Sequence, residues 1–80
     1  MPTILRVDGL RVVIYPNDHM PEHVHVIGAA GEVLFNLHCP NGPPVLRENY
    51  GFSRAEVTWI AAELLPHVGR LCEEWSRIHG

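Results

Sequence analysis

The chain has 80 residues, of which 46% are apolar and 19% charged, a composition typical of one small globular domain. Six arginines, no lysine and nine acidic residues give a formal net charge of −3. This charge disfavours broad, non-specific nucleic-acid binding but leaves room for a local site built from arginine. Because a single core is marginal at this length, we expect a homo-oligomer or a protein partner to complete it.

The apolar runs are far shorter than the roughly 20 residues that cross a bilayer, so we expect no membrane span. The N-terminus lacks a basic segment followed by an apolar one, so we expect no signal peptide and a cytoplasmic location. Cys39 and Cys72 are too few for a disulfide framework. We therefore expect two free thiols, with Cys72 in the core.

Alternating apolar and polar residues predict four strands in the first half of the chain, over residues 4–7, 10–15, 23–27 and 32–38. Asp8-Gly9 indicates a two-residue hairpin turn, because both positions of such a turn need positive φ. Residues 28–31 indicate a second tight connection. After a proline-rich loop, residues 45–50 are expected to form a short extended piece or a single turn.

The second half of the chain predicts a helix. Ser53 and Glu56 have the spacing of a capping box, and Phe52 and Val57 the spacing of a hydrophobic staple. Apolar residues then recur every three or four positions and form one stripe. They are Val57, Ile60, Ala61, Leu64, Val68, Leu71, Cys72 and Trp75. Because Pro66 lacks a backbone donor, we expect a kink or a break near Leu64–Leu65.

These elements predict a single α+β domain. We expect a four-stranded antiparallel meander that is covered on one face by the C-terminal helix, kinked or broken near Pro66. The other face is then open to water or buried in a partner. The two turns assign side chains to that open face. They are Ile4, Arg6, Arg11, Val13, Tyr15, His23, His25, Glu32, Leu34, Asn36 and His38.

Arg6 lies directly opposite Arg11 in this register, and directly opposed like charges are unfavourable. The pair indicates a bound anion, or a carboxylate from a partner or from the loop at residues 45–50. Alternatively, both side chains splay into solvent.

The run from His19 to Val26 contains two histidines, His23 and His25, that point to the same side of a strand. With His19 and with His38 or Cys39 they have the residue types of a site for a divalent metal such as zinc. The same pair also suits acid–base cleavage of RNA without a cofactor, with Arg6, Arg11 or Arg47 on the phosphate. The third interpretation is structural: the rings bond backbone groups or line an oligomer interface.

A second possible phosphate site lies before the helix, where Arg47 and Arg54 flank the sequence Asn49-Tyr50-Gly51-Phe52. Turn chemistry explains the same residues without a ligand. Trp59 falls outside the apolar stripe, and we expect it to be exposed and available to a partner.

Three blocks and one tryptophan resemble small bacterial proteins of the family called domain of unknown function 4160. The blocks are Met1–Arg6, His19–Val26 and Glu48–Ser53, and the tryptophan is Trp75. The chain departs from the family at Pro21-Glu22, where the family usually has two prolines. The resemblance carries over His19, His23, His25 and Asn49-Tyr50-Gly51 as family features without assigning them a role.

The resemblance implies a partner, because family members are encoded beside another small protein in a pattern similar to a toxin–antitoxin pair. We therefore expect a component of such a pair. In its most specific form, this expectation is a ribonuclease-type toxin that depends on His23 and His25. The alternatives are an antitoxin or partner-binding module whose open sheet face is an interface, and a small histidine-rich metal-binding protein.

Overall fold

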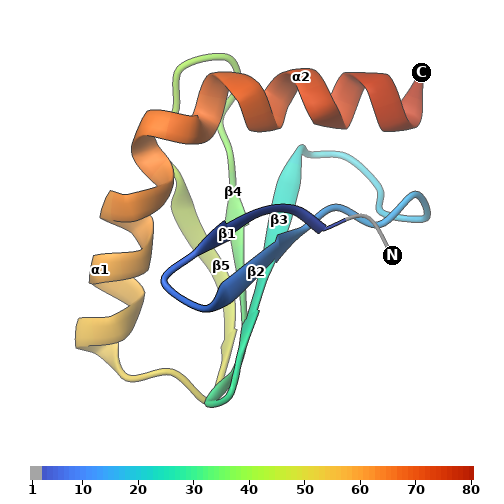
Figure 1. The fold of residues 1–80 in the computed structure, drawn as a ribbon. Coiled ribbons are helices and arrows are strands. Elements are labelled where there is room, and N and C mark those ends of the chain that lie inside the picture. Colours follow the sequence, from blue (N-terminus) through green and yellow to red (C-terminus); the bar gives the residue numbers. More distant parts are fainter. Residues whose placement is uncertain (1–2) are drawn as a thin grey trace.

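The computed structural model describes residues 3–80, which form a five-stranded antiparallel sheet followed by two helices (Figure 1). The strands are β1 (Thr3–Val7), β2 (Leu10–Val13), β3 (His23–Gly28), β4 (Gly31–Asn36) and β5 (Val45–Tyr50). The helices are α1 (Arg54–Leu64) and α2 (Val68–His79), joined by a 3-10 turn (Leu65–His67). The strands follow one another in the sheet in chain order, which is the predicted meander.

The sheet has five strands, so the prediction of four is wrong. The added strand is β5, which lies at one edge of the sheet, and all six of its residues are exposed. Its polar centre gives no apolar alternation, because an exposed edge strand needs no buried face. Leu34 pairs with Glu48 and Phe35 with Leu46, which leaves Arg47 as an extra residue in a bulge.

The predicted turns and registers are confirmed. Asp8 has a φ of 47° and Gly9 a φ of 82°, and Arg6 pairs with Arg11 across this hairpin. Between β3 and β4, Ile27 pairs with Glu32 and Val26 with Val33. Gly28 also pairs with Gly31, so the connection is a tight turn at Ala29 and Ala30.

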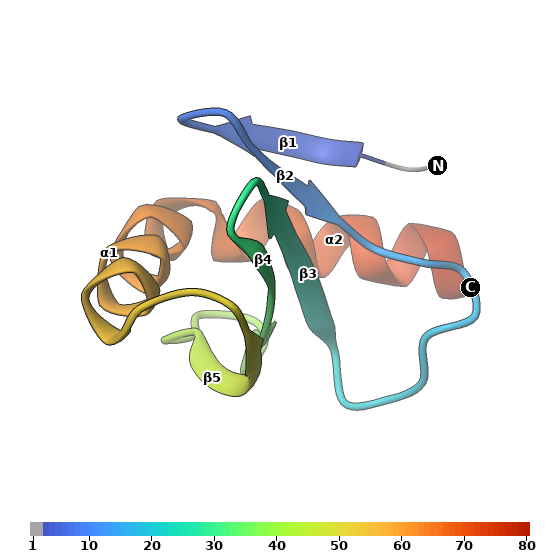
Figure 2. The same cartoon turned by 90° about the horizontal axis from the view of Figure 1, so that it is seen from below.

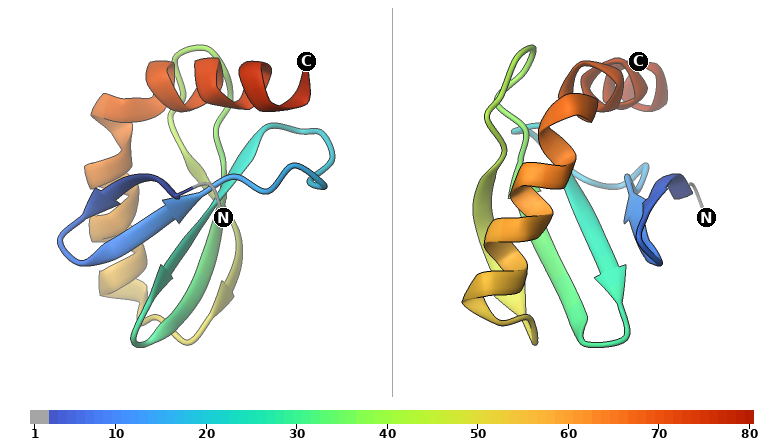
Figure 3. Two further views of the ribbon diagram at one scale, coloured as in Figure 1. Left: turned by 45° about the vertical axis from the view of Figure 1, so that its right-hand side comes forward. Right: turned by 60° about the vertical axis from the view of Figure 1, so that its left-hand side comes forward.

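The core lies between the helices and the predicted apolar face of the sheet. Seven side chains of this face are fully buried: Val12, Ile14, Val24, Val26, Val33, Phe35 and Leu37. Leu5 and Leu10 on the same face are partly buried. Figures 2 and 3 show that the β1–β2 hairpin is steeply inclined to β3–β5, so the sheet is strongly twisted. The opposite face is only partly open, because Val13 and Leu34 on that face are also buried. Among residues 3–80 no helix combines the length and the apolar character needed to cross a membrane.

The helical segment begins and breaks where the sequence predicts. Ser53 and Glu56 form the capping box, and Phe52 and Val57 are both buried in the core. The segment is broken rather than kinked, because Pro66 lies in a 3-10 turn that separates α1 from α2. In Figure 1, α1 runs beside the strands, whereas α2 crosses the end of the sheet.

The two cysteines form a disulfide, so the prediction of free thiols is wrong. Cys39 in the loop after β4 and Cys72 on α2 have Cα atoms 5.8 Å apart. The loop and the helix meet along an open groove that both cysteines line together with Asn41 and Gly69. A sequence separation of 33 means that local sequence patterns do not reveal this proximity. The cytoplasmic location stays a prediction. Unpaired thiols are typical of the cytosol, but the two cysteines of this chain are paired.

Candidate functional site

His25 on β3 lies between two carboxylates on the face of the sheet opposite the main core. Its Nδ1 atom is 2.6 Å from Oε2 of Glu32, which lies on β4. Its Nε2 atom is 3.1 Å from Oδ2 of Asp18, which lies in the loop between β2 and β3. Both ring nitrogens of His25 therefore face negatively charged oxygens, and the side chain is only 13% exposed.

Asp18 is held in place by a turn at the end of β2. Its backbone N–H donates to the carbonyl oxygen of Tyr15 over 3.0 Å, and its Oδ2 atom accepts from the backbone N–H of Tyr15 over 3.1 Å. The Pro16-Asn17 pair supplies the turn. The carboxylate is thereby fixed before any ligand arrives.

His23 completes a group of three around Asp18. Its Nδ1 atom donates to the carbonyl oxygen of Pro21 over 2.8 Å, because a carbonyl can only accept. Its Nε2 atom is 3.5 Å from Oδ2 of Asp18. The ring is buried at 4% exposure and packs against Trp75 of α2, with ring centroids 5.2 Å apart. The second helix thus forms one wall of the site.

The positions of the two imidazole rings and the Asp18 carboxylate favour a positive charge between them. When His25 is neutral and donates from Nδ1 to Glu32, its Nε2 lone pair points at the carboxylate of Asp18. His23, donating from Nδ1 to Pro21, likewise directs the Nε2 of a neutral ring at Asp18. A lone pair that faces a carboxylate is repelled unless a proton or a metal ion lies between them. The three side chains therefore form a candidate cation site, with one donor atom from each within 4.8 Å of the others.

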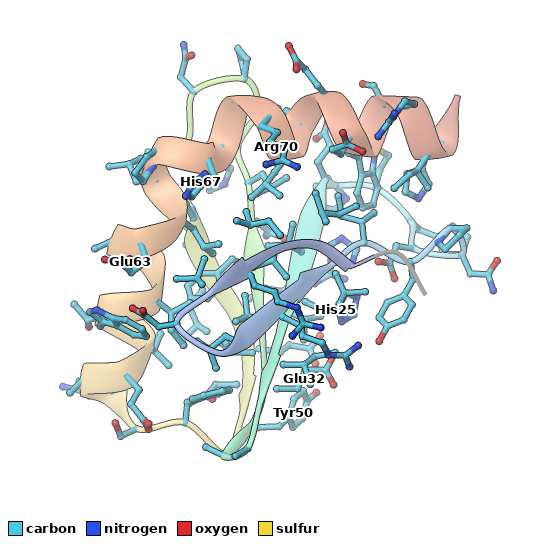
Figure 4. All side chains as sticks on the ribbon, in the orientation of Figure 1. His25, Glu32, Tyr50, Glu63, His67 and Arg70 are labelled. Carbon is cyan, nitrogen blue, oxygen red and sulfur yellow. A yellow bond between two sulfur atoms is a disulfide. The ribbon has the colours of Figure 1, made fainter. Side chains whose placement is uncertain are left out.

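Further polar groups surround this cation site. Figure 4 shows His25, Glu32 and Tyr50 near one another on the same side of the sheet. Tyr50 donates its phenol O–H to Glu48, and this bond, with the negative charges of Glu48 and Glu32, raises the pKa of Tyr50 above its ordinary value of 10.0. Asn36 on β4 pairs with His23, and its Oδ1 atom is buried without a hydrogen-bond partner among residues 3–80. It is an acceptor that an arriving donor can satisfy.

The structure brings together only two of the four histidines proposed as metal ligands. His23 and His25 share the site, whereas His19 is exposed in the preceding loop and lies outside the group of three. His38 follows the end of β4 with a φ of 52°, and its ring bonds the carbonyl oxygen of Pro43 over 3.1 Å. His38 therefore lies in an exposed loop, whereas the sequence predicts that it lies on the strand and on the open face of the sheet.

The other proposed binding residues are spread over the same face and its edge. Arg6 and Arg11 lie opposite one another on β1 and β2, as the register predicts. Arg47 lies in the bulge of β5, with its Nε atom 3.9 Å from Glu48. The Asn49 side chain bonds both the N–H and the C=O of Phe52, which is the turn chemistry expected for Asn49-Tyr50-Gly51-Phe52.

Sequence reasoning missed Asp18 as a site residue. It belongs to a Pro-Asn-Asp turn, and such residues are ordinarily explained by the turn itself. A usable signal was the acidic residue next to His19, at the start of the histidine run. Only the folded loop shows that its carboxylate turns back onto β3.

The comparisons with known proteins place the chain in a family. No curated protein and no solved structure matches the sequence. Residues 9–76, which include Asp18, His23, His25 and Glu32, match the profile described as "Domain of unknown function (DUF4160)". The match covers well over half of the chain, and the chain therefore belongs to the DUF4160 family.

Proposed function

We propose that this protein binds a divalent transition-metal ion, such as zinc, through Asp18, His23 and His25. The observation that carries the proposal is the convergence of two imidazole nitrogens on one fixed carboxylate, to which no arginine of residues 3–80 is ion-paired. Imidazole and carboxylate donors suit zinc, iron, nickel and copper.

Two of the three distances between donor atoms fit one ion. Two ligands that are each about 2.1 Å from a tetrahedral metal lie about 3.4 Å apart. The Nε2 atoms of His25 and His23 are 3.1 and 3.5 Å from Oδ2 of Asp18. Three protein ligands leave coordination positions open for water or a substrate, which is the pattern of catalytic rather than structural zinc.

The surrounding hydrogen bonds match those of metal-binding histidines. Such histidines donate their second ring N–H to a carboxylate or a backbone carbonyl, which fixes the tautomer and the ring orientation. His25 has Glu32 in this role, and His23 has the carbonyl oxygen of Pro21. Both donors to the metal are therefore oriented by the fold.

Binding is tested on tag-free protein with Zn²⁺ by calorimetry and with Co²⁺ by fluorescence. In a Trp59→Phe variant only Trp75 emits, and its ring lies 5.2 Å from that of His23, so Co²⁺ in the site quenches it. We expect one ion per chain. His25→Ala and Asp18→Asn each weaken binding by at least about 100-fold, because each removes one of three ligands.

Two histidines supply matched controls. His19→Ala and His38→Ala remove imidazoles that the sequence suggests as ligands but that lie outside the group, so they leave the affinity unchanged. Circular dichroism checks that every variant is folded. Equal affinity in the parent and the folded Asp18→Asn and His25→Ala variants contradicts the proposal.

We propose, as a second candidate function, that the protein is one component of a toxin–antitoxin-like pair with ribonuclease-type activity that depends on His23 and His25. The observation that favours it is the Asp18–His25–Glu32 arrangement, because a carboxylate that orients an imidazole prepares it for proton transfer. Its partner is a small protein encoded nearby.

The second candidate is tested by inducing the protein in a bacterial host without its partner. Growth arrest by the parent but not by the folded His25→Ala variant supports it. If neither arrests growth, the toxin role is contradicted in that host, and the favoured role becomes an antitoxin or partner-binding module whose open sheet face is the interface.

A further inference from the structure

Arg6 and Arg11 form a pair of like charges on the face of the sheet that carries the cation site. They lie directly opposite one another across the β1–β2 hairpin, an arrangement that repulsion disfavours. None of the ion pairs among residues 3–80 includes either side chain. Arg47 and Arg77 each have a glutamate partner, whereas Arg54 and Arg70, like Arg6 and Arg11, have none among residues 3–80.

The register sets this pair beside the proposed metal ligands. Arg11 pairs with Ile27, and Val13, two residues further along the same strand, pairs with His25. His25 is therefore the diagonal neighbour of Arg11, at a spacing of about 7–8 Å on one face, which a long side chain bridges. Ile27 in turn pairs with Glu32, so Arg11, Ile27 and Glu32 follow one another across the sheet.

The carboxylate nearest to Arg11 in this row is already engaged. Glu32 accepts from Nδ1 of His25 over 2.6 Å. Arg11 thus lies on the strand next to His25, and Arg6 lies one strand further out. Neither side chain is ion-paired to a carboxylate of residues 3–80. A local positive patch in a chain of net charge −3 favours one anionic ligand over general attraction to polyanions.

We infer that Arg6 and Arg11 bind the phosphate group of a ligand that also reaches the metal held by Asp18, His23 and His25. This inference rests on the proposed metal-binding function. Guanidinium groups hold phosphate oxygens with paired, charge-assisted hydrogen bonds. A phosphate group has enough oxygens to contact two guanidinium groups and still offer one to an open coordination position. A phosphate ester or free phosphate is therefore the ligand class.

The test uses the full chain loaded with Co²⁺, whose paramagnetism broadens the ³¹P resonance of any phosphorus atom held close to it. The probes are inorganic phosphate and a dinucleoside monophosphate, which separate free phosphate from a nucleic-acid diester. We expect broadening of at least one probe. Arg6→Gln/Arg11→Gln raises the Kd of that probe by at least about tenfold while the Co²⁺ affinity stays unchanged.

The matched control is Arg70→Gln/Arg77→Gln, which removes the same charge from exposed positions of α2 and leaves the Kd of the probe unchanged. If Co²⁺ binds and neither probe is broadened, or both double variants bind the probe alike, the inference is overturned. If Co²⁺ itself does not bind, the metal proposal fails. Calorimetry of phosphate with the metal-free parent and the two double variants then tests the arginine pair by the same comparison.

Discussion

His25 and Glu32 are joined across the tight β3–β4 turn by a hydrogen bond of 2.6 Å between Nδ1 and Oε2. The two residues are diagonal neighbours, because Glu32 pairs with Ile27 and Leu34 pairs with His25. This bond depends on the register of the hairpin, since a slip of one residue would move one side chain to the opposite face. The turn at Ala29 and Ala30 is thus part of what aims the imidazole at Asp18.

Replacing Glu32 by glutamine tests this relationship. The neutral amide still fills the space but loses the charge that strengthens the bond to His25, so we expect the affinity for Zn²⁺ to fall about 10–100-fold. Calorimetry measures the change, and Glu63→Gln on the exposed surface of α1 is the control. Equal affinities of the two variants would contradict an orienting role for Glu32.

The capping box predicts a measurable contribution to stability. Ser53→Ala leaves the backbone N–H of Glu56 without its acceptor and is expected to destabilise the fold by about 1 kcal/mol. Urea unfolding followed by circular dichroism measures the free energy of unfolding. Ser76→Ala, at an exposed position of α2, is expected to change it far less, and a reversed order of the two effects would refute the prediction.

The disulfide predicts a larger effect. It closes a loop with a sequence separation of 33, and chain entropy gives about 3–4 kcal/mol of stabilisation for such a loop. We expect reduction of the parent to lower the free energy of unfolding by about this amount. The double substitution Cys39→Ser/Cys72→Ser is expected to have the same effect. A reductant should have no further effect on the double variant, which is the internal control.

Tyr50 predicts a change in alkaline titration. Its pKa is raised in the folded protein by the hydrogen bond to Glu48 and by the negative charges of Glu48 and Glu32. The associated stabilisation is present below the unfolded pKa and is lost as the pH rises through the folded value. In Glu48→Gln we expect the phenol to ionise at lower pH than in the parent. Tyrosinate absorbance in a Tyr15→Phe background reports Tyr50 alone, and an unshifted midpoint would contradict the assignment.

The sequence was sufficient to predict most of the fold. The β1–β2 and β3–β4 registers, the capping box and the break near Pro66 follow from local chemistry: positive φ at Asp8-Gly9, reciprocal bonding at Ser53 and Glu56, and a missing N–H. The fifth strand was missed because β5 is exposed throughout and has no apolar alternation. The disulfide was missed because loop and helix come together only in the folded chain.

The candidate site could be predicted only in part, because some of its residues come together only in the folded chain. His23 and His25 share a strand face, which their spacing of two already requires. Asp18 reaches them through a loop, and the paths of loops are not fixed by periodicity. His38 is the opposite case. Its spacing predicts a position on the same sheet face as His23, but its positive φ removes it from the strand.

The bulge at Arg47 has a consequence for the behaviour of the protein at high concentration. β5 is an exposed edge strand whose backbone groups would otherwise offer a regular template to a strand of another molecule. The extra residue interrupts the regular spacing of that template and places a charged side chain at the interruption. The edge is therefore protected against edge-to-edge pairing into aggregates, even though Leu46 and Tyr50 are exposed on it.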